Sequence, residues 1–272
     1  AGAFDGVTVT NMDGLTIPSV GGVDTTVLVI GDFSNGNDGI LINGEAGVGV
    51  QDLKGKDVKL VELSVSHYLL TRALEREGLS ERDLTVINTS DADLGSLIST
   101  SDPGDSFVTW NPILQTGRGV AGIHIVFDSS EIPGEIVDTI MVRTALDENC
   151  KKAVTGAWYE AMSDMASNSN EAVEFMAELA GGTLDEFVAQ LKTTRMFYDA
   201  ADAADATASK TACPRRRGRR AAFPARRRDG AGTCRARTAA GSSSWTIWAT
   251  CSPSSARATP ATARLLSPSL CC

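Results

Sequence analysis

The stretch LKGKDVKLVELSVSHYLLTRALEREGL, residues 53–79, decides the fold. Residues 58–63 alternate apolar and polar side chains, which predicts a strand, and a polar elbow follows at 64–67. Beyond it, apolar side chains recur at helical spacing, and Gly78 is placed to end a helix. In this βα unit, we expect Ser66 to be the helix N-cap and the first N–H groups of the helix to face the carboxyl end of the strand.

Other strands and helices alternate around this unit. Between the first two strands, Pro18 and a pair of glycines leave room only for a short helix. A further short helix is expected at 91–100, with Asp91 as its N-cap. Strand-like runs lie at 4–10, 25–30, 40–42, 84–88, 106–110, 123–127 and 136–142. This alternation predicts an α/β fold with a mainly parallel sheet.

From residue 150 the pattern becomes helical. Apolar side chains share one face over 152–168, and 170–180 repeats the pattern before a pair of glycines. Thr183 and Glu186 then form a capping box that opens a helix to about residue 192.

The composition limits the classes of function. Of the 272 residues, 42% are hydrophobic and 22% are charged, which is ordinary for a globular protein. The formal net charge of -9 argues against a nucleic-acid-binding protein. No run approaches the ~18 apolar residues of a membrane span. An acidic chain is compatible with a cationic or neutral solute, and equally with plain solubility.

The residues from about 207 onward differ sharply from the rest. Asp229 is the only acidic residue there, against Lys210 and a dozen arginines. The runs PRRRGRR and PARRRDG have neither a helical nor a strand period. We interpret this tail, from about residue 205, as disordered and as the product of a shifted reading frame. The alternative is a basic arm that binds nucleic acid.

Several stretches together resemble a known family. They are the βα unit with VELSVSHYLL (61–70), NTSDADL (88–94), VTWNP (108–112) and FDSSEIPGEI (127–136). They are similar to periplasmic solute-binding proteins of the nitrate/sulfonate/taurine class, often called NMT1/THI5-like. Within that class they resemble the binding proteins associated with urea carboxylase, thought to carry urea or guanidine. The resemblance covers residues 4–200.

The resemblance implies a two-lobed periplasmic-binding-protein-like fold (type II). A member of the family would have a signal peptide and one more βα unit before Phe4, so we expect an incomplete first lobe. The expected division is residues 1–42 for the remainder of the first lobe and the crossover, 43–140 for the second α/β lobe, 141–205 for the helical return to the first lobe, and 206–272 for the tail.

The same resemblance implies a monomeric, periplasmic, non-catalytic component of an ABC transporter. It would deliver a small solute to a permease, with the lobes closing about a hinge. We expect no cofactor, no metal and no nucleic-acid partner.

A ligand in such a fold lies beyond the carboxyl ends of the strands. The side chains just past each strand suit a small, planar, hydrogen-bonding solute such as urea or guanidinium, because amides and hydroxyls donate and accept, an indole stacks, and carboxylates match N–H pairs. The candidate ligand-binding residues are Asn11, Asp13, Ser34, Asn35, Asn37, Ser66, His67, Trp110, Asn111, Asp128, Ser129, Glu135 and Asp138. Each can instead be a cap, a turn residue or a core residue.

The alternative function is an enzyme of the same superfamily, a THI5-like synthase of a pyrimidine precursor. It would need a pyridoxal-phosphate lysine or a set of iron-binding histidines, whereas the chain has only His67 and His124. The sequence also contains no dinucleotide-binding loop, phosphate-binding loop or serine-hydrolase elbow. It leaves the choice between urea and guanidine open.

Limited proteolysis should cut within the arginine runs and leave a core that ends near residue 200. The tail offers too little apolar surface to offset the entropy of ordering it. Mass spectrometry of the fragments locates the cuts, and a tail that resists the protease would contradict the shifted reading frame.

Overall fold

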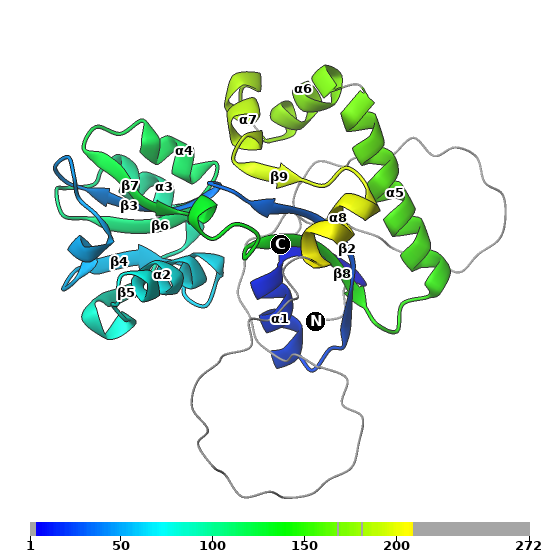
Figure 1. Cartoon of the computed structure of the whole chain (residues 1–272), viewed down its shortest axis with the longest axis horizontal. Coiled ribbons are helices and arrows are strands. Elements are labelled where there is room, and N and C mark those ends of the chain that lie inside the picture. Colours follow the sequence, from blue (N-terminus) through cyan, green and yellow to red (C-terminus); the bar gives the residue numbers. More distant parts are fainter. Residues whose placement is uncertain (1–3, 168, 181, 209–272) are drawn as a thin grey trace, which may run out of the picture.

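The computed structural model describes residues 4–167, 169–180 and 182–208, so the expected tail lies outside the described residues except for 206–208, which end a helix. The described chain forms two lobes, each built on one sheet (Figure 1). None of the described helices is long and apolar enough to cross a membrane.

The first lobe is built on a four-stranded sheet. Its strands, in the order β1-β8-β2-β9, are β1 (Gly6–Thr10), β8 (Val137–Arg143), β2 (Thr25–Ser34) and β9 (Thr194–Met196), and every pair is antiparallel. The helices of this lobe are α1 (Asn11–Val20), α5 (Glu148–Ser167), α6 (Ser169–Ala180), α7 (Leu184–Leu191) and α8 (Ala200–Ala208). Met162, Met165 and Val173 form the buried contact between α5 and α6. Thr183 and Glu186 make the expected capping box of α7.

The second lobe is built on a five-stranded sheet. Its strands, in the order β5-β4-β6-β3-β7, are β5 (Thr85–Asn88), β4 (Asp57–Leu60), β6 (Ser106–Trp110), β3 (Asp38–Asn43) and β7 (Ile123–Asp128). Its helices are α2 (Val65–Arg76), α3 (Asp91–Ser99) and α4 (Ile113–Arg118), with 3-10 turns η1 (Val50–Leu53), η2 (Glu81–Asp83) and η3 (Ser129–Glu131). Strand β3 therefore belongs to this sheet, whereas the expected division left most of it with the first lobe.

The expectation of a mainly parallel sheet was wrong. Among the described strand pairs only β4–β5 and β4–β6 are parallel. Strand β3 arrives directly from β2 of the other lobe and runs away from that lobe, so its neighbours β6 and β7 run back toward it. Alternating apolar patterns give the position of a strand and not its direction, which is why the sequence could not show this.

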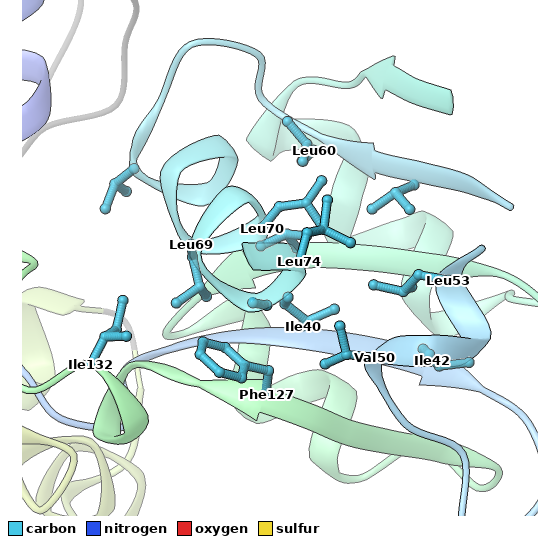
Figure 2. Close-up of a cluster of buried hydrophobic side chains, with 14 of the residues drawn as sticks. Ile40, Ile42, Val50, Leu53, Leu60, Leu69, Leu70, Leu74, Phe127 and Ile132 are labelled. Atoms are coloured by element: carbon cyan, nitrogen blue, oxygen red, sulfur yellow. The ribbon is translucent and has the colours of Figure 1, made fainter. Parts of the chain in front are cut away.

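The stretch 53–79 forms the core of the second lobe as predicted. Helix α2 buries Leu69, Leu70, Ala73 and Leu74 completely against the sheet, and Figure 2 shows these leucines above Ile40 and Phe127. Each fully buried leucine contributes roughly 1.5–3 kcal/mol.

The predicted start of α2 was two residues late. Ser64 is the N-cap, because its Oγ accepts a hydrogen bond from the Ser66 N–H at 3.1 Å, and Ser66 is a buried residue of the first turn. Leu63, at φ 59°, turns the chain between β4 and α2. Both serines satisfy the sequence preference for a cap, and only the backbone geometry separates them.

Two other helix starts differ from expectation. Helix α1 begins at Asn11 and extends through Pro18 to Val20, so it is longer than predicted. Its N-cap is Thr10, whose Oγ1 accepts from the Asp13 N–H at 3.3 Å. Ser90, and not Asp91, occupies the N-cap position of α3. Asp91 is the first helical residue, and the helix dipole stabilises a negative charge at that position.

Helix α3 should depend on Leu94 far more than on Leu97. Leu94 is completely buried, whereas Leu97 on the same helix is 37% exposed. Leu94→Ala should lower the free energy of unfolding by about 2–5 kcal/mol, and Leu97→Ala should lower it by less than about 1 kcal/mol. Thermal unfolding followed by circular dichroism compares the two variants. Equal losses would contradict this packing of α3.

Candidate ligand-binding junction

The facing edges of the two sheets meet at a junction, which two connections cross. In the first lobe, the register pairs Thr10 and Asp32 with Asp138, which places the end of β1 and the start of β8 at this edge. In the second lobe, Asp38 pairs with Trp110 and Gly39 pairs with Asp128. The junction is thus lined by the ends of β1, β2, β6 and β7 and by the starts of β3 and β8.

Buried hydroxyls tie the two connections to each other. Ser129, after β7, accepts hydrogen bonds from the Gly36 N–H at 2.8 Å and the Asp38 N–H at 3.4 Å. Because its lone pairs are engaged, its hydroxyl donates to Ser34 Oγ at 2.6 Å, and Ser34 donates to Asp38 Oδ2 at 2.5 Å. All three side chains are buried. This chain links the β2–β3 connection to the β7–β8 connection.

The second connection is also held from both lobes. Asn11 at the start of α1 donates to the Glu135 carbonyl at 2.9 Å and accepts from the Val137 N–H at 3.2 Å. The Glu135 carboxylate accepts from Tyr68 Oη at 2.6 Å and from Arg72 Nε at 2.7 Å, both on α2. Burial, and then this carboxylate, raise the pKa of Tyr68 to about 12. Asn11 and Glu135 therefore connect the lobes.

Asn111 also bridges the lobes, through a residue of the first connection and through Thr193. Its Nδ2 donates to Asn37 Oδ1 at 2.9 Å and to Thr193 Oγ1 at 3.2 Å, and Thr193 precedes β9 of the first lobe. The Asn35 N–H donates to the Thr193 carbonyl at 2.8 Å. Asn111 is 8% exposed, and its Oδ1 has no hydrogen-bond partner among the described residues.

Trp110 and Asp13 lie on the two facing edges. The Trp110 indole N–H donates to Asp91 Oδ1 at 3.3 Å, which fixes the ring at the end of β6. Asp13, in the first turn of α1, is 4% exposed. Its Oδ2 accepts from Thr10 Oγ1 at 3.1 Å, and its Oδ1 has no hydrogen-bond partner among the described residues. Burial raises the pKa of Asp13, and repulsion from Asp138 and from Asp91 of the other lobe adds to it.

Further carboxyl groups crowd the same place. Asp32 and Asp138 are cross-strand partners whose carboxyl groups lie side by side. Burial, and then Asp138, raise the pKa of Asp32 well above its usual range, and burial also raises that of Asp138. Burial raises the pKa of Asp38 to about 7, and Asp138 contributes to that increase. Among the described residues, no ion pair neutralises any of these three groups.

The remaining predicted residues have local roles. His67 Nδ1 accepts from the Leu63 N–H at 3.0 Å, and its Nε2 lies 3.2 Å from Glu81 Oε1, so the ring joins the start of α2 to η2. Asp128 caps η3 by accepting from the Ser130 N–H at 2.9 Å. Asn35 belongs to the first connection, and it is exposed. Among the described residues, no group of three or more His, Cys, Asp or Glu side chains could hold a metal ion.

Sequence reasoning missed two residues of the junction. Asp91 was assigned only a capping role, although its carboxylate holds Trp110 and acts on Asp13 across the junction. Thr193 lies far along the chain after the helices of the first lobe, and no local pattern connects it with Asn111. The motif NTSDADL, which contains Asp91, was the one available signal.

The comparisons with known proteins concern the fold. No protein-family model matches the chain, and no curated protein sequence is similar to it. The periplasmic aliphatic sulphonate binding protein SsuA from Escherichia coli is a structural neighbour with a TM-score of 0.62 and 19% identity, covering 79% of this chain and 77% of that one.

Two further neighbours differ in activity. The ligand-binding component of an ABC-type import system from Staphylococcus aureus, with zinc bound, has a TM-score of 0.54 and 13% identity, covering 75% of this chain and 72% of that one. The desulfurization enzyme DSZB has a TM-score of 0.53 and 14% identity, covering 74% and 75%. At these identities the likeness concerns the fold alone. The described chain has the two-lobed α/β fold of periplasmic binding proteins.

Proposed function

We propose that the chain is the solute-binding component of an ABC importer and that a small nitrogenous solute, urea or a guanidine-like molecule, binds at the junction. The observation that carries the proposal is the convergence of polar side chains from both lobes on one place, where two connections cross. Asn11 and Asp13 come from one lobe, and Trp110 and Asn111 from the other. The partner would be a membrane permease, and the protein would work in the periplasm as a monomer.

Closure about the two connections would be the mechanism. A solute that contacts both lobes binds the closed state better than the open state and so shifts the equilibrium between them. The bridges from Asn111 to Thr193 and from Asn11 to the Glu135–Val137 segment show that short-range contacts between the lobes are available at this place.

The positions of the titratable residues do not favour the enzyme alternative. His124 Nε2 lies 3.1 Å from the Gly44 carbonyl, near the start of β7 and so at the edge of the sheet away from the junction. His67 is engaged by Leu63 and Glu81. Lys59 pairs with Asp105 at 2.6 Å, beside the start of β6. These residues do not gather as a pyridoxal-phosphate or iron site would require.

Isothermal titration of the protein with urea, guanidinium chloride, nitrate, taurine and a thiamine precursor tests the proposal. We expect saturable binding of urea or guanidinium, at millimolar concentrations too low to denature the protein. Small-angle X-ray scattering with the ligand that binds should show a smaller radius of gyration, because the lobes close. Binding of none of the five would contradict the proposed function.

The carboxyl groups at the junction should make stability depend on pH. Asp13, Asp32, Asp38 and Asp138 all have raised pKa values, so the folded chain holds protons to higher pH than the unfolded chain does. The free energy of unfolding is therefore highest below the ordinary aspartate pKa, and it decreases as the pH rises and these groups ionise. For Asp38 this decrease continues up to a pH of about 7. The melting temperature should therefore fall between about pH 5 and pH 8.

Asp38→Asn isolates one of these groups. An amide keeps an acceptor for the Ser34 hydroxyl and does not ionise. The melting temperature of the variant should therefore decrease less than that of the parent over the same pH range. Differential scanning calorimetry at matched ionic strength measures the two slopes. Identical slopes would show that Asp38 does not titrate in this window.

A further inference from the structure

The first connection between the lobes is bound to a different lobe on each side of Gly36. Before Gly36, the Asn35 N–H donates to the Thr193 carbonyl of the first lobe at 2.8 Å. After it, the Asn37 carbonyl accepts from the Asn111 N–H of the second lobe at 2.9 Å. Gly36 itself has a φ of 108°, a conformation that is open to glycine and that other residues rarely adopt. The connection can therefore bend at Gly36 while each of its flanks stays bound to its own lobe.

Thr193 is the residue through which the first lobe reaches the second lobe at this place. It lies between α7 and β9, and its hydroxyl donates to the Gln190 carbonyl in the last turn of α7 at 2.7 Å. A hydroxyl has one proton, so the same oxygen accepts from Asn111 Nδ2 at 3.2 Å. The Asn111 amide also donates to Asn37 Oδ1 at 2.9 Å. The Asn111 side chain is thus held between the first connection and the first lobe.

The hydrogen bond between Thr193 and Asn111 depends on how the lobes are arranged. The Thr193 side chain lies against the bend, since a Cβ at Gly36 would be 3.6 Å from Thr193 Cβ. A rotation at Gly36 that moves the turn between α7 and β9 away from the end of β6 lengthens this hydrogen bond. Asn111 is buried, so little water is present to replace the bond. The bond therefore favours the arrangement seen in the structure over arrangements with the lobes further apart.

We propose that Thr193 and Asn111 form a latch, with Gly36 as its pivot, that controls how often the two lobes separate. This inference rests on the solute-binding function proposed above, and it concerns the regulation of the same site. A solute that needs both lobes binds only the molecules whose lobes are together, so the latch raises the apparent affinity by raising that fraction. Thr193 acts through the arrangement of the lobes and is not among the candidate ligand-binding residues.

Three variants isolate the Thr193 hydroxyl. Thr193→Val removes the hydroxyl and keeps a β-branched side chain. Thr193→Ser keeps the hydroxyl and should restore the latch. The matched control is Thr155→Val in α5, because the Thr155 hydroxyl donates to the Lys151 carbonyl at 3.0 Å within a single helix. Circular dichroism and thermal unfolding show whether each variant is folded.

Single-molecule energy transfer measures lobe separation in the absence of any solute. The two dyes are attached through non-canonical amino acids at Ala46 and Ala157, which are exposed positions of the second and the first lobe. In Thr193→Val, the ratio of separated to joined molecules should increase about two- to tenfold, because one hydrogen bond between the lobes is lost. In Thr193→Ser and in Thr155→Val, this ratio should stay within about twofold of that of the parent chain.

An unchanged ratio in folded Thr193→Val overturns the latch, and so does an equal increase in Thr155→Val. Titration of the parent chain and of Thr193→Val with urea and with guanidinium chloride then tests the effect on binding. The affinity should fall by the same factor as the fraction of joined molecules, and an affinity that does not follow this fraction overturns the control of binding by the latch. Binding of neither solute by the folded parent chain defeats the proposed function. The latch is measured without solute, so its own result stands apart from that outcome.

Discussion

The hydroxyl of Ser129 is the point on which the arrangement of the lobes depends. It accepts two backbone N–H groups of the first connection and donates to Ser34, while Ser129 itself belongs to the second connection. The two segments that join the lobes therefore behave as one buried, hydrogen-bonded unit. Asp38 ends this chain of hydrogen bonds and begins β3, so the same unit sets where the five-stranded sheet starts.

The burial of carboxyl groups in and beside this unit lowers the free energy of unfolding, and the rest of the structure must offset that loss. Asp38 is almost completely buried and lacks a neutralising cation among the described residues, and burial also raises the pKa values of the neighbouring Asp32 and Asp138 carboxyl groups. A fold selected for stability alone would place apolar side chains at such positions. The large apolar core under α2, with four fully buried residues from one helix, offsets part of this cost at a distance from the junction. Stability thus resides mainly in the lobes, and charge is concentrated between them.

Local patterns in the sequence predicted the fold in good part. The βα unit at 53–79 and the capping box of Thr183 follow from periodicity and turn chemistry. Strand direction did not follow, because an alternating pattern is the same in both directions. The cap of α2 was misplaced because Ser64 and Ser66 are chemically equivalent at that spacing, and the left-handed backbone at Leu63 decides between them.

The junction was harder to predict for a different reason. The structure places residues that follow a predicted strand at the junction, as it does for Trp110 and Asn111 after β6. Their partners come from segments that are distant in the sequence, such as Thr193 after the helices of the first lobe. No pattern in the sequence indicates that such segments are close in space. Asp91 shows the difficulty most clearly, since an acidic residue at a helix start already has a sufficient local explanation in the helix dipole.

That double role of Asp91 also bears on how a two-lobed fold changes its ligand. The two-lobed fold is shared with a protein that binds aliphatic sulphonates, and a sulphonate group presents hydrogen-bond acceptors only. Strand ends and helix N-termini supply N–H donors in any sequence, and they favour anions. Two side-chain carboxylates, Asp13 in the first turn of α1 and Asp91 in the first turn of α3, oppose that preference. Acidic residues at helix starts therefore act against the anion preference that the backbone of this fold provides, while the sheets and the connections stay the same.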